Sequence, residues 1–268
     1  MTTENHNAIV SAQFSPQAHA YLASATHAAG EDLDQMAGLI GERKDAIALD
    51  MGCGAGHAAF RLAPRVKKVV ACDLSETMLG VVADEARRRG LDNLVTRQGA
   101  AEALPCPSAS FDVAVTRYSA HHWRDLPAGL AQMRRVLKPH GLAVFMDVIS
   151  PDDPLLDTWL QAFELLRDPS HVRNRSLTEW QTLLTAAGFA VGSATRFRLR
   201  LEFSAWTERM KTPAIHLAAI RSLQRNAGSD VADYFAIEDD GSFTLDTALI
   251  AATANPIAIQ DHKVQSGI

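Results

Sequence analysis

The feature that most constrains the fold is a glycine-rich turn that directly follows a short apolar run. Residues 48–56 read Ala-Leu-Asp-Met-Gly-Cys-Gly-Ala-Gly, and a helix can begin directly after them. Because glycine has no side chain, such a turn lets the backbone approach a ligand closely at the end of a strand. The motif therefore predicts a strand, a ligand-binding turn and a helix in that order. Its candidate ligand-binding residues are Asp50, Gly52, Cys53, Gly54 and Gly56.

The segment from residue 46 to residue 149 alternates short apolar runs with amphipathic stretches, which is typical of a parallel sheet covered by helices. Helices are expected over 76–89, with Ser75 as the N-cap, and over 126–137, where Pro139 prevents continuation. The nearly continuous apolar runs indicate strands that are buried on both faces. The expected strands are 46–50, 68–73, 94–98, 111–116 and 142–148.

The second half of the chain has a different pattern. The capping-box pair Ser176 and Glu179 opens an expected helix, and apolar residues alternate with arginines over 191–203, which predicts an antiparallel or edge strand. A helical stretch and a last strand over 243–253 follow. Together these patterns predict an α/β fold, with a doubly wound, mostly parallel, Rossmann-like sheet of seven strands and a helical cap. The expected parts are a helical cover over 1–45, a ligand-binding domain over 46–203 and 241–255, and a helical cap insertion over 204–240.

The composition is that of an ordinary globular protein, since 47% of the 268 residues are apolar and 21% are charged. The 31 acidic and 26 basic residues give a net charge of −5, and no basic stripe is evident, so no nucleic-acid partner is expected. Cys53, Cys72 and Cys106 lack the spacing of a disulfide framework or a zinc site, and no metal is expected. With neither an apolar leader nor an apolar run of about 18 residues, the protein is expected to be cytoplasmic, without a membrane span.

Two aspartates indicate which kind of ligand the turn binds. The glycine spacing departs from the Gly-x-Gly-x-x-Gly of dinucleotide sites, because His57 occupies the third position. Asp50, just before the turn, would repel a pyrophosphate but could bind a cationic amino group. Asp73 ends the second strand, 17 residues after Gly56, where a carboxylate can accept hydrogen bonds from both hydroxyls of a ribose. The pair favours a ligand with an ammonium and a sulfonium group, and the plain structural alternative is a common turn followed by a surface acid.

Three further segments complete a recognisable combination. Residues 98–105 read Gln-Gly-Ala-Ala-Glu-Ala-Leu-Pro, residues 110–113 read Ser-Phe-Asp-Val, and residues 135–141 read Arg-Val-Leu-Lys-Pro-His-Gly. With the glycine turn, they resemble class I S-adenosylmethionine-dependent methyltransferases, in particular the ubiquinone/menaquinone C-methyltransferase family and its small-molecule relatives. The resemblance extends over about residues 14–150 and, more loosely, over 183–189.

The resemblance implies that the cofactor is S-adenosyl-L-methionine, with the glycines of the turn near its methionine part. Ala100 departs from the family, which usually has an aspartate hydrogen-bonded to the adenine amino group, so backbone or water must replace that contact. His140 replaces a glycine and is expected to alter only a turn. The resemblance places Asp73 at the ribose, Leu74 and Met78 over the adenine, and Ala101 with Glu102 along the adenine edge. The full set of expected cofactor-binding residues is Asp50, Gly52, Cys53, Gly54, Gly56, Asp73, Leu74, Met78, Ala100, Ala101, Glu102 and Arg117.

The segment 116–123 follows the fourth strand, at the sheet edge where open α/β folds hold ligands, and is expected to face the reacting methyl. It lacks the Asp/Asn-Pro-Pro-aromatic run that characterises amino-group nucleic-acid methyltransferases, and Cys106 lacks the Pro-Cys setting of cytosine C5 enzymes. His121 and His122 can titrate near neutrality, so either is a candidate general base. The alternative role for both histidines is packing or contact with the cofactor. Methyl transfer needs no general base if positioning of the acceptor beside the methyl group accounts for the rate acceleration.

Two segments are candidates for binding the methyl acceptor. Tyr21 and His27 belong to a stretch with helical spacing that resembles the family segment folded over the cofactor, although a plain amphipathic helix explains them equally. His171 and Arg173 lie where relatives build substrate walls and could bind an anionic or carbonyl-bearing acceptor, whereas a solvated loop is the alternative.

The expected function is methyl transfer from S-adenosylmethionine to a small-molecule acceptor, such as a quinone precursor or another aromatic metabolite. The fold hosts C-, N- and O-methylation, so it does not select among them. The alternatives are a non-catalytic S-adenosylmethionine-binding sensor or scaffold and a nicotinamide-dependent dehydrogenase. The sequence leaves open whether the protein is a monomer or a homodimer.

Overall fold

The computed structural model of the protein describes residues 5–23 and 29–256. One sheet with the strand order β3-β2-β1-β4-β5-β8-β7 forms its centre, and a short strand, β6, pairs with β5. The pairs from β3 to β5 are parallel, whereas β8 runs antiparallel to both β5 and β7. The expected doubly wound, mostly parallel α/β fold is therefore confirmed. The strands are β1 Arg43–Met51, β2 Val66–Asp73, β3 Leu94–Gln98, β4 Phe111–Arg117, β5 Leu137–Ser150, β6 Arg175–Ser176, β7 Phe189–Leu201 and β8 Phe243–Ala254.

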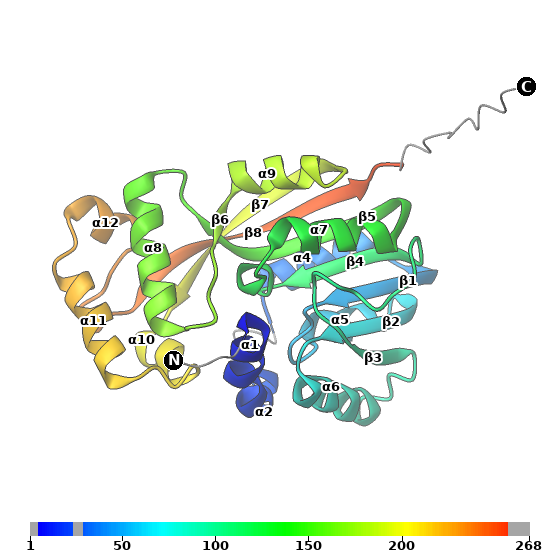
Figure 1. Ribbon diagram of the computed structural model, residues 1–268, viewed down its shortest axis with the longest axis horizontal. Coiled ribbons are helices and arrows are strands. Elements are labelled where there is room, and N and C mark those ends of the chain that lie inside the picture. Colours follow the sequence, from blue (N-terminus) through cyan, green and yellow to red (C-terminus); the bar gives the residue numbers. More distant parts are fainter. Residues whose placement is uncertain (1–4, 24–28, 257–268) are drawn as a thin grey trace, which may run out of the picture.

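Helices cover both faces of the sheet (Figure 1). They do so because the central strands have buried apolar side chains on each side. One apolar layer joins α4 (Glu31–Ile40), α5 (His57–Leu62) and α6 (Glu76–Arg88) to the sheet, and another joins α7 (Leu126–Val136) and α9 (Leu177–Ala186) to its opposite face. Successive side chains of a strand point to opposite faces of the sheet, so neighbouring residues belong to different layers: Ala48 packs in the first layer and Leu49 in the second.

The local signals at helix ends act as expected. The Ser75 hydroxyl accepts a hydrogen bond from the Met78 N–H at the start of α6. Ser176 and Glu179 form a complete capping box at the start of α9. The strand after α7 begins earlier than expected, at Leu137 rather than Leu142, because β5 bulges where it pairs with β4. His140 lies in this bulge with a φ of +62°, a left-handed conformation that explains why a glycine suits the position.

The late part of the chain forms a third apolar cluster, at the end of the sheet where β7 and β8 extend. Strand β7 is the expected antiparallel edge strand, and three helices lie between it and β8: α10 (Phe203–Glu208), α11 (Ala214–Arg225) and α12 (Ser229–Tyr234). They pack with α8 (Pro154–Arg167) through residues such as Phe163, Ile220 and Phe235. Helix α8 falls within the range 46–203 that the sequence assigns to the ligand-binding domain. Figure 1 shows this helical cap at the left, joined to the sheet by the long strands β7 and β8. The division into domains stays a prediction.

The N-terminal cover consists of α1 (His6–Phe14), a short 3₁₀ turn η1 (Ser15–Gln17) and α2 (Ala18–Ala23). It lies near the carboxyl ends of the parallel strands, between α6 and the helical cap (Figure 1). The Ser15 hydroxyl lies 2.8 Å from the Ser75 hydroxyl of α6, and the Gln13 amide donates to the Met210 carbonyl of the cap. In the ranges 5–23 and 29–256, no helix has the length and apolarity to cross a membrane.

Candidate active site

The glycine turn after β1 is tightly specified, and each of its three glycines is required for a different reason. All three have positive φ angles, from +49° to +87°. A Cβ on Gly52 would overlap the Ser119 hydroxyl, and one on Gly56 would lie 2.9 Å from Val82 Cγ2 and 3.0 Å from Phe60 Cζ. A Cβ on Gly54 would meet no atom of the described residues within 4 Å. Only Gly54 therefore keeps space open for a ligand, whereas Gly52 and Gly56 allow neighbouring segments of the protein to pack.

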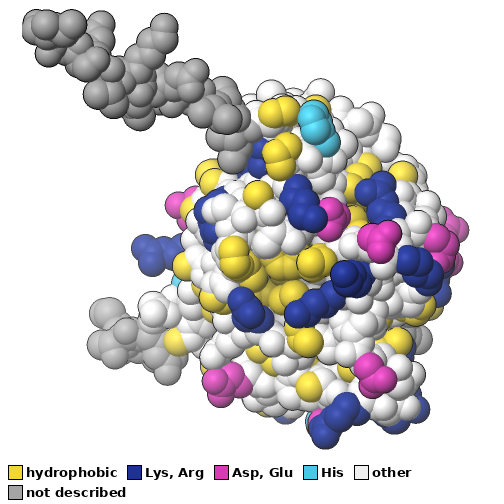
Figure 2. All heavy atoms as spheres, turned by 90° about the vertical axis from the view of Figure 1, so that its right-hand side faces the viewer, with side chains coloured by type: hydrophobic (Ala, Val, Ile, Leu, Met, Phe, Trp, Pro, Cys, Tyr) yellow, Lys and Arg dark blue, Asp and Glu magenta, His cyan; other side chains and the backbone are white. Residues whose placement is uncertain are grey.

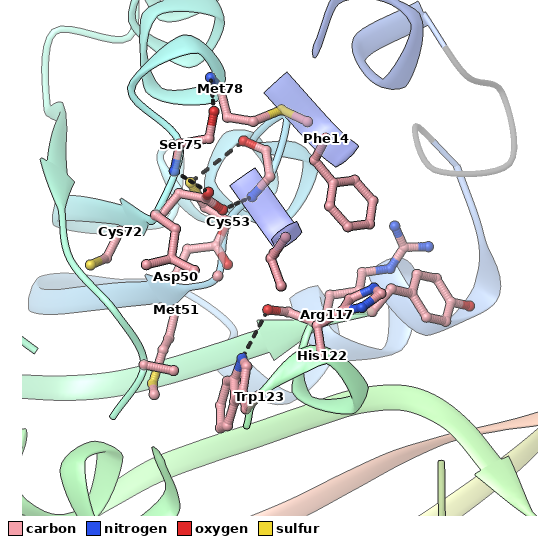
Figure 3. A pocket seen from close by; sticks show the side chains of 18 of the residues that line it. Phe14, Asp50, Met51, Cys53, Cys72, Ser75, Met78, Arg117, His122 and Trp123 are labelled. Carbon is pink, nitrogen blue, oxygen red and sulfur yellow. Dashed lines mark hydrogen bonds between the residues drawn. The ribbon is translucent and has the colours of Figure 1, made fainter. Parts of the chain in front are cut away.

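A pocket opens in front of this turn and encloses about 1080 Å³ of space, including its open mouth. Its walls are the glycine turn, the end of β2 with the start of α6, the segment after β3, and the segment after β4. Helix α1 contributes Val10 and Phe14, and α2 contributes Tyr21, so the N-terminal cover closes one side (Figure 3). The expected cofactor-binding residues that line the pocket are Asp50, Gly52, Cys53, Gly54, Asp73, Leu74, Met78, Ala101, Glu102 and Arg117.

Two of the expected cofactor residues do not line the pocket. Gly56 faces Val82 and Phe60, as its packing requires. Ala100 forms an isolated bridge with Ala103 and leaves the pocket wall to its neighbours Ala101 and Glu102. These two positions shape the turns rather than the surface that a ligand would touch.

The two aspartates have different surroundings. Asp50 is 1% exposed and accepts a hydrogen bond from the Ala59 N–H at 2.9 Å, and burial raises its pKa to about 7. The Asp73 carboxylate accepts hydrogen bonds from the N–H groups of Gly54, at 2.8 Å, and Ser75, at 2.9 Å. Burial raises the pKa of Asp73 despite these bonds. Asp50 thus holds the helix that follows the turn, and Asp73 holds the turn itself.

Arg117 stands at the end of β4 and joins the pocket to α4. Its guanidinium forms a buried ion pair with Asp32, with Nε 2.5 Å from Oδ2. The next residue, Tyr118, adopts a φ of +48°, which is rare for a bulky side chain and is held by a hydrogen bond from its N–H to the Met146 carbonyl. Backbone strain of this kind concentrates at functional sites, and both residues line the pocket.

The adjacent histidines occupy a short 3₁₀ turn, η2 (Ala120–His122), and have different partners. His122 lines the pocket, and its ring lies 5.0 Å from the Phe14 ring of the cover. Burial lowers the pKa of His122 to about 3, with a further contribution from His121. His121 is not a pocket-lining residue, and its Nδ1 lies 2.5 Å from Asp147 Oδ1. Burial opposes charge on His121, but Asp147 outweighs it, so the pKa of His121 is raised.

The structure places the expected acceptor-binding residues unevenly. Tyr21 lines the pocket, and burial raises the pKa of its phenol. His27 lies outside the described residues. His171 and Arg173 do not line the pocket, because the ring of His171 bonds to Gln161 and Arg173 pairs with Asp157 of α8. These two residues fasten the loop after α8 instead.

Sequence reasoning missed several residues of the site. Ser119 lines the pocket, packs against Gly52 and accepts a hydrogen bond from the Trp123 indole at 3.1 Å. Tyr118 and Trp123 also line the pocket (Figure 3 labels Trp123). Their position in the segment after β4 was the available signal, since the whole segment was expected to face the ligand.

Comparisons with known proteins identify the class. A family model described as a methyltransferase domain matches residues 49–145. The uncharacterized protein YafE of Escherichia coli is 47% identical over 75% of this chain and 97% of its own length. The uncharacterized methyltransferase YcgJ of Bacillus subtilis is 36% identical over 84% of this chain and 88% of its own length. The chain belongs to the class I S-adenosylmethionine-dependent methyltransferase family, and it is a methyltransferase. The dehydrogenase alternative is therefore disfavoured.

Solved structures agree with this assignment. The crystal structure of YcgJ matches with a TM-score of 0.80 at 34% identity, covering 84% of this chain and 99% of that chain. A putative methyltransferase from Bacillus halodurans matches with a TM-score of 0.82 at 28% identity, covering 85% and 100%. A 2-phytyl-1,4-naphtoquinone methyltransferase from Synechococcus elongatus is 37% identical, but only over 43% of this chain and 51% of its own length.

Proposed function

We propose that the protein transfers a methyl group from S-adenosylmethionine to a small-molecule acceptor bound between the N-terminal cover and the segment after β4. One observation carries the proposal: Gly54 has open space at its α-carbon in the same pocket where the Asp73 carboxylate is fixed by the backbone. A close backbone approach beside an oriented carboxylate suits a ligand with a ribose and an amino-acid chain.

The residues present fit this cofactor. A carboxylate has about four acceptor sites, and backbone N–H groups of Gly54, Ser75 and Leu74 interact with Asp73, so these bonds orient the carboxylate and leave acceptor capacity for a ribose hydroxyl. Leu74 and Met78 provide an apolar wall for the adenine, and Ala101 with Glu102 lies along its edge. Since Asp50 titrates near neutrality, its carboxylate is available to a cationic amino group above about pH 7.

When bound, the cofactor supplies a methyl group already activated by its sulfonium, so the protein mainly positions the acceptor and excludes water. The cover contributes to both tasks. Phe14 and Tyr21 form an apolar edge-to-face pair with ring centroids 5.6 Å apart, beside His122. Such a wall suits a flat aromatic acceptor.

Aromatic metabolites, including quinone precursors, are therefore the acceptor class that we propose. The partial similarity to the naphthoquinone methyltransferase supports this class without fixing the compound. The net charge of −5 does not favour a nucleic-acid acceptor. On the face shown in Figure 2, acidic and basic side chains are interspersed. The absence of a nucleic-acid partner and the cytoplasmic location stay predictions, and the choice between monomer and homodimer stays open.

The test is a transfer assay with S-adenosylmethionine labelled at the methyl group and a panel of hydroxylated aromatic compounds, including a reduced, unmethylated naphthoquinone. We expect S-adenosylhomocysteine and a methylated product in equal amounts, and less of both from the Gly54→Ala variant at the same concentration of S-adenosylmethionine. Binding of S-adenosylmethionine without transfer to any acceptor would instead support the sensor or scaffold alternative.

A further inference from the structure

Behind His122, the loop after α8 holds a carboxylate that the site described above does not use. Asp168 is 1% exposed. Its Oδ1 atom accepts hydrogen bonds from the Ser170 N–H, at 2.8 Å, and the Ser170 hydroxyl, at 2.6 Å. Its Oδ2 atom is fully buried and has no hydrogen-bond partner among the described residues. A buried carboxylate oxygen without a donor is costly, so a donor is expected there when the protein works.

The hydrogen bonds of His122 fix which of its nitrogens carries a proton. Its Nδ1 lies 3.1 Å from the Ser170 carbonyl oxygen, which can only accept, so Nδ1 carries the hydrogen and donates it. The Ser170 hydroxyl, which donates to Asp168, is a second acceptor for the same nitrogen at 3.3 Å. Since His122 is held neutral, its Nε2 has a free lone pair. The Nε2 atom of His122 lies 4.0 Å from Asp168 Oδ2.

Two hydrogen-bond acceptors thus lie 4.0 Å apart, His122 Nε2 on a residue of the pocket wall and Asp168 Oδ2 buried behind it. Among the described residues, Asp168 Oδ2 has no hydrogen-bond donor. Two side chains with positive charge, His121 and Arg167, lie in the same region, and each is paired with a carboxylate. His121 and Arg167 both influence His171 electrostatically as positive charges, and His121 does the same to His122. Asp147 balances His121 at 2.5 Å, and Glu164 lies 3.6 Å from Arg167. A neutral hydroxyl can donate to either acceptor, and transfer of its proton to the carboxylate neutralises the charge that is left without a partner in the described part of the chain.

We propose that Asp168 Oδ2 and His122 Nε2 form the subsite for an ionisable hydroxyl of the methyl acceptor, a phenol or an enol, and that Asp168 takes its proton. The inference rests on the proposed function and specifies its acceptor. The carboxylate is the stronger hydrogen-bond acceptor of the two because it is charged. The neutral imidazole of His122 borders the hydroxyl and keeps the subsite free of a competing donor.

The chemical step balances. The acceptor's O–H bond breaks and its proton bonds to Asp168 Oδ2. The electron pair of the resulting anion, at oxygen or at a carbon conjugated with it, forms the bond to the methyl carbon. The electron pair of the broken carbon–sulfur bond stays on sulfur, which loses its positive charge. The proton leaves Asp168 for solvent when the methylated product departs.

The test uses three probes of similar shape, 4-nitrophenol, 4-nitroanisole and 4-nitroaniline, bound to the full chain in the presence of saturating S-adenosylhomocysteine. Asp168→Asn keeps Oδ1 for the Ser170 contacts and replaces only Oδ2 by a donor. Asp152→Asn, at an exposed aspartate near the start of α8, is the matched control. Absorbance reports the ionisation of 4-nitrophenol directly, and calorimetry reports the affinities.

We expect the wild-type protein and Asp152→Asn to bind 4-nitrophenol about tenfold or more tightly than 4-nitroanisole, and Asp168→Asn to lose this preference. The apparent pKa of the bound phenol should be lower in Asp168→Asn than in the wild type, because the negative charge beside it is removed. Equal binding of phenol and ether by the wild type, tighter binding of 4-nitroaniline, or an unchanged preference in Asp168→Asn would each overturn the proposal. If Asp168→Asn does not fold, the relative affinities of the wild-type protein for 4-nitrophenol, 4-nitroanisole and 4-nitroaniline still test the proposal. Failure of S-adenosylhomocysteine to bind any of these proteins would instead refute the proposed function.

Discussion

Replacing Gly54 by alanine separates ligand binding from folding more cleanly than any other single change in the glycine turn. Within residues 5–23 and 29–256 the new methyl group meets no atom within 4 Å, so the cost to the folded state is that of the left-handed backbone conformation, at a φ of +49°. That conformation costs about 1 to 2 kcal/mol for a residue with a side chain. At about 2 to 4 °C per kcal/mol, the melting temperature should fall by about 2 to 8 °C. The methyl group enters the pocket, and the resulting overlap should weaken S-adenosylhomocysteine binding by a further 1 to 3 kcal/mol, or about 5- to 150-fold.

Gly90→Ala is the matched control, because Gly90 has a φ of +67°, also has no atom within 4 Å of its would-be Cβ, and does not line the pocket. It should lose a similar amount of stability and no affinity. Calorimetric titration and thermal unfolding of both variants measure the two quantities. Wild-type affinity in Gly54→Ala, or equal losses of affinity in both variants, would refute the assignment of Gly54 to the ligand surface.

Three further changes have defined outcomes. Asp73→Ala should weaken S-adenosylhomocysteine binding by about 1.5 to 3 kcal/mol in calorimetry, through lost charge-assisted hydrogen bonds. Burial opposes charge on His121, but Asp147 outweighs it, so the pKa of His121 is higher in the folded than in the unfolded protein. The ion pair therefore stabilises the fold fully at a pH below the unfolded-state pKa of His121. This stabilisation is lost as the pH rises through the folded-state pKa of His121. Asp147→Asn should lower the His121 pKa in an NMR titration and weaken that pH dependence of unfolding. Asp32→Ala should cost about 3 to 5 kcal/mol in denaturant unfolding, because it leaves the buried charge of Arg117 without its carboxylate.

Much of the fold follows from local sequence signals. Strands and helices could be placed from the sequence because the signals that define them are local. These signals are the apolar runs, the Ser75 N-cap and the capping box of Ser176 and Glu179, each of which involves residues close together in the sequence. The extended start of β5 could not, because the bulge at His140 depends on how β5 pairs with β4. The position of α8 in the cap also depends on packing between distant segments.

The site shows the same division between local and tertiary information. The glycine turn and Asp73 were recognisable because their chemistry is concentrated in short motifs at strand ends. The sequence did not show that Gly56 serves packing, since Val82 and Phe60 reach it only in the folded chain. Nor did it separate Arg173, which pairs with Asp157, from Asp168, whose free oxygen faces His122. Both residues belong to one polar loop, and only the tertiary structure distinguishes their roles.

Calorimetric titration of the wild-type protein with S-adenosylhomocysteine and with NAD tests the central claim most directly. The pocket formed by the glycine turn, Asp73 and the N-terminal cover predicts binding of one S-adenosylhomocysteine per chain with a micromolar dissociation constant, and no measurable binding of NAD. Binding of NAD together with no binding of S-adenosylhomocysteine at millimolar concentration would contradict the account.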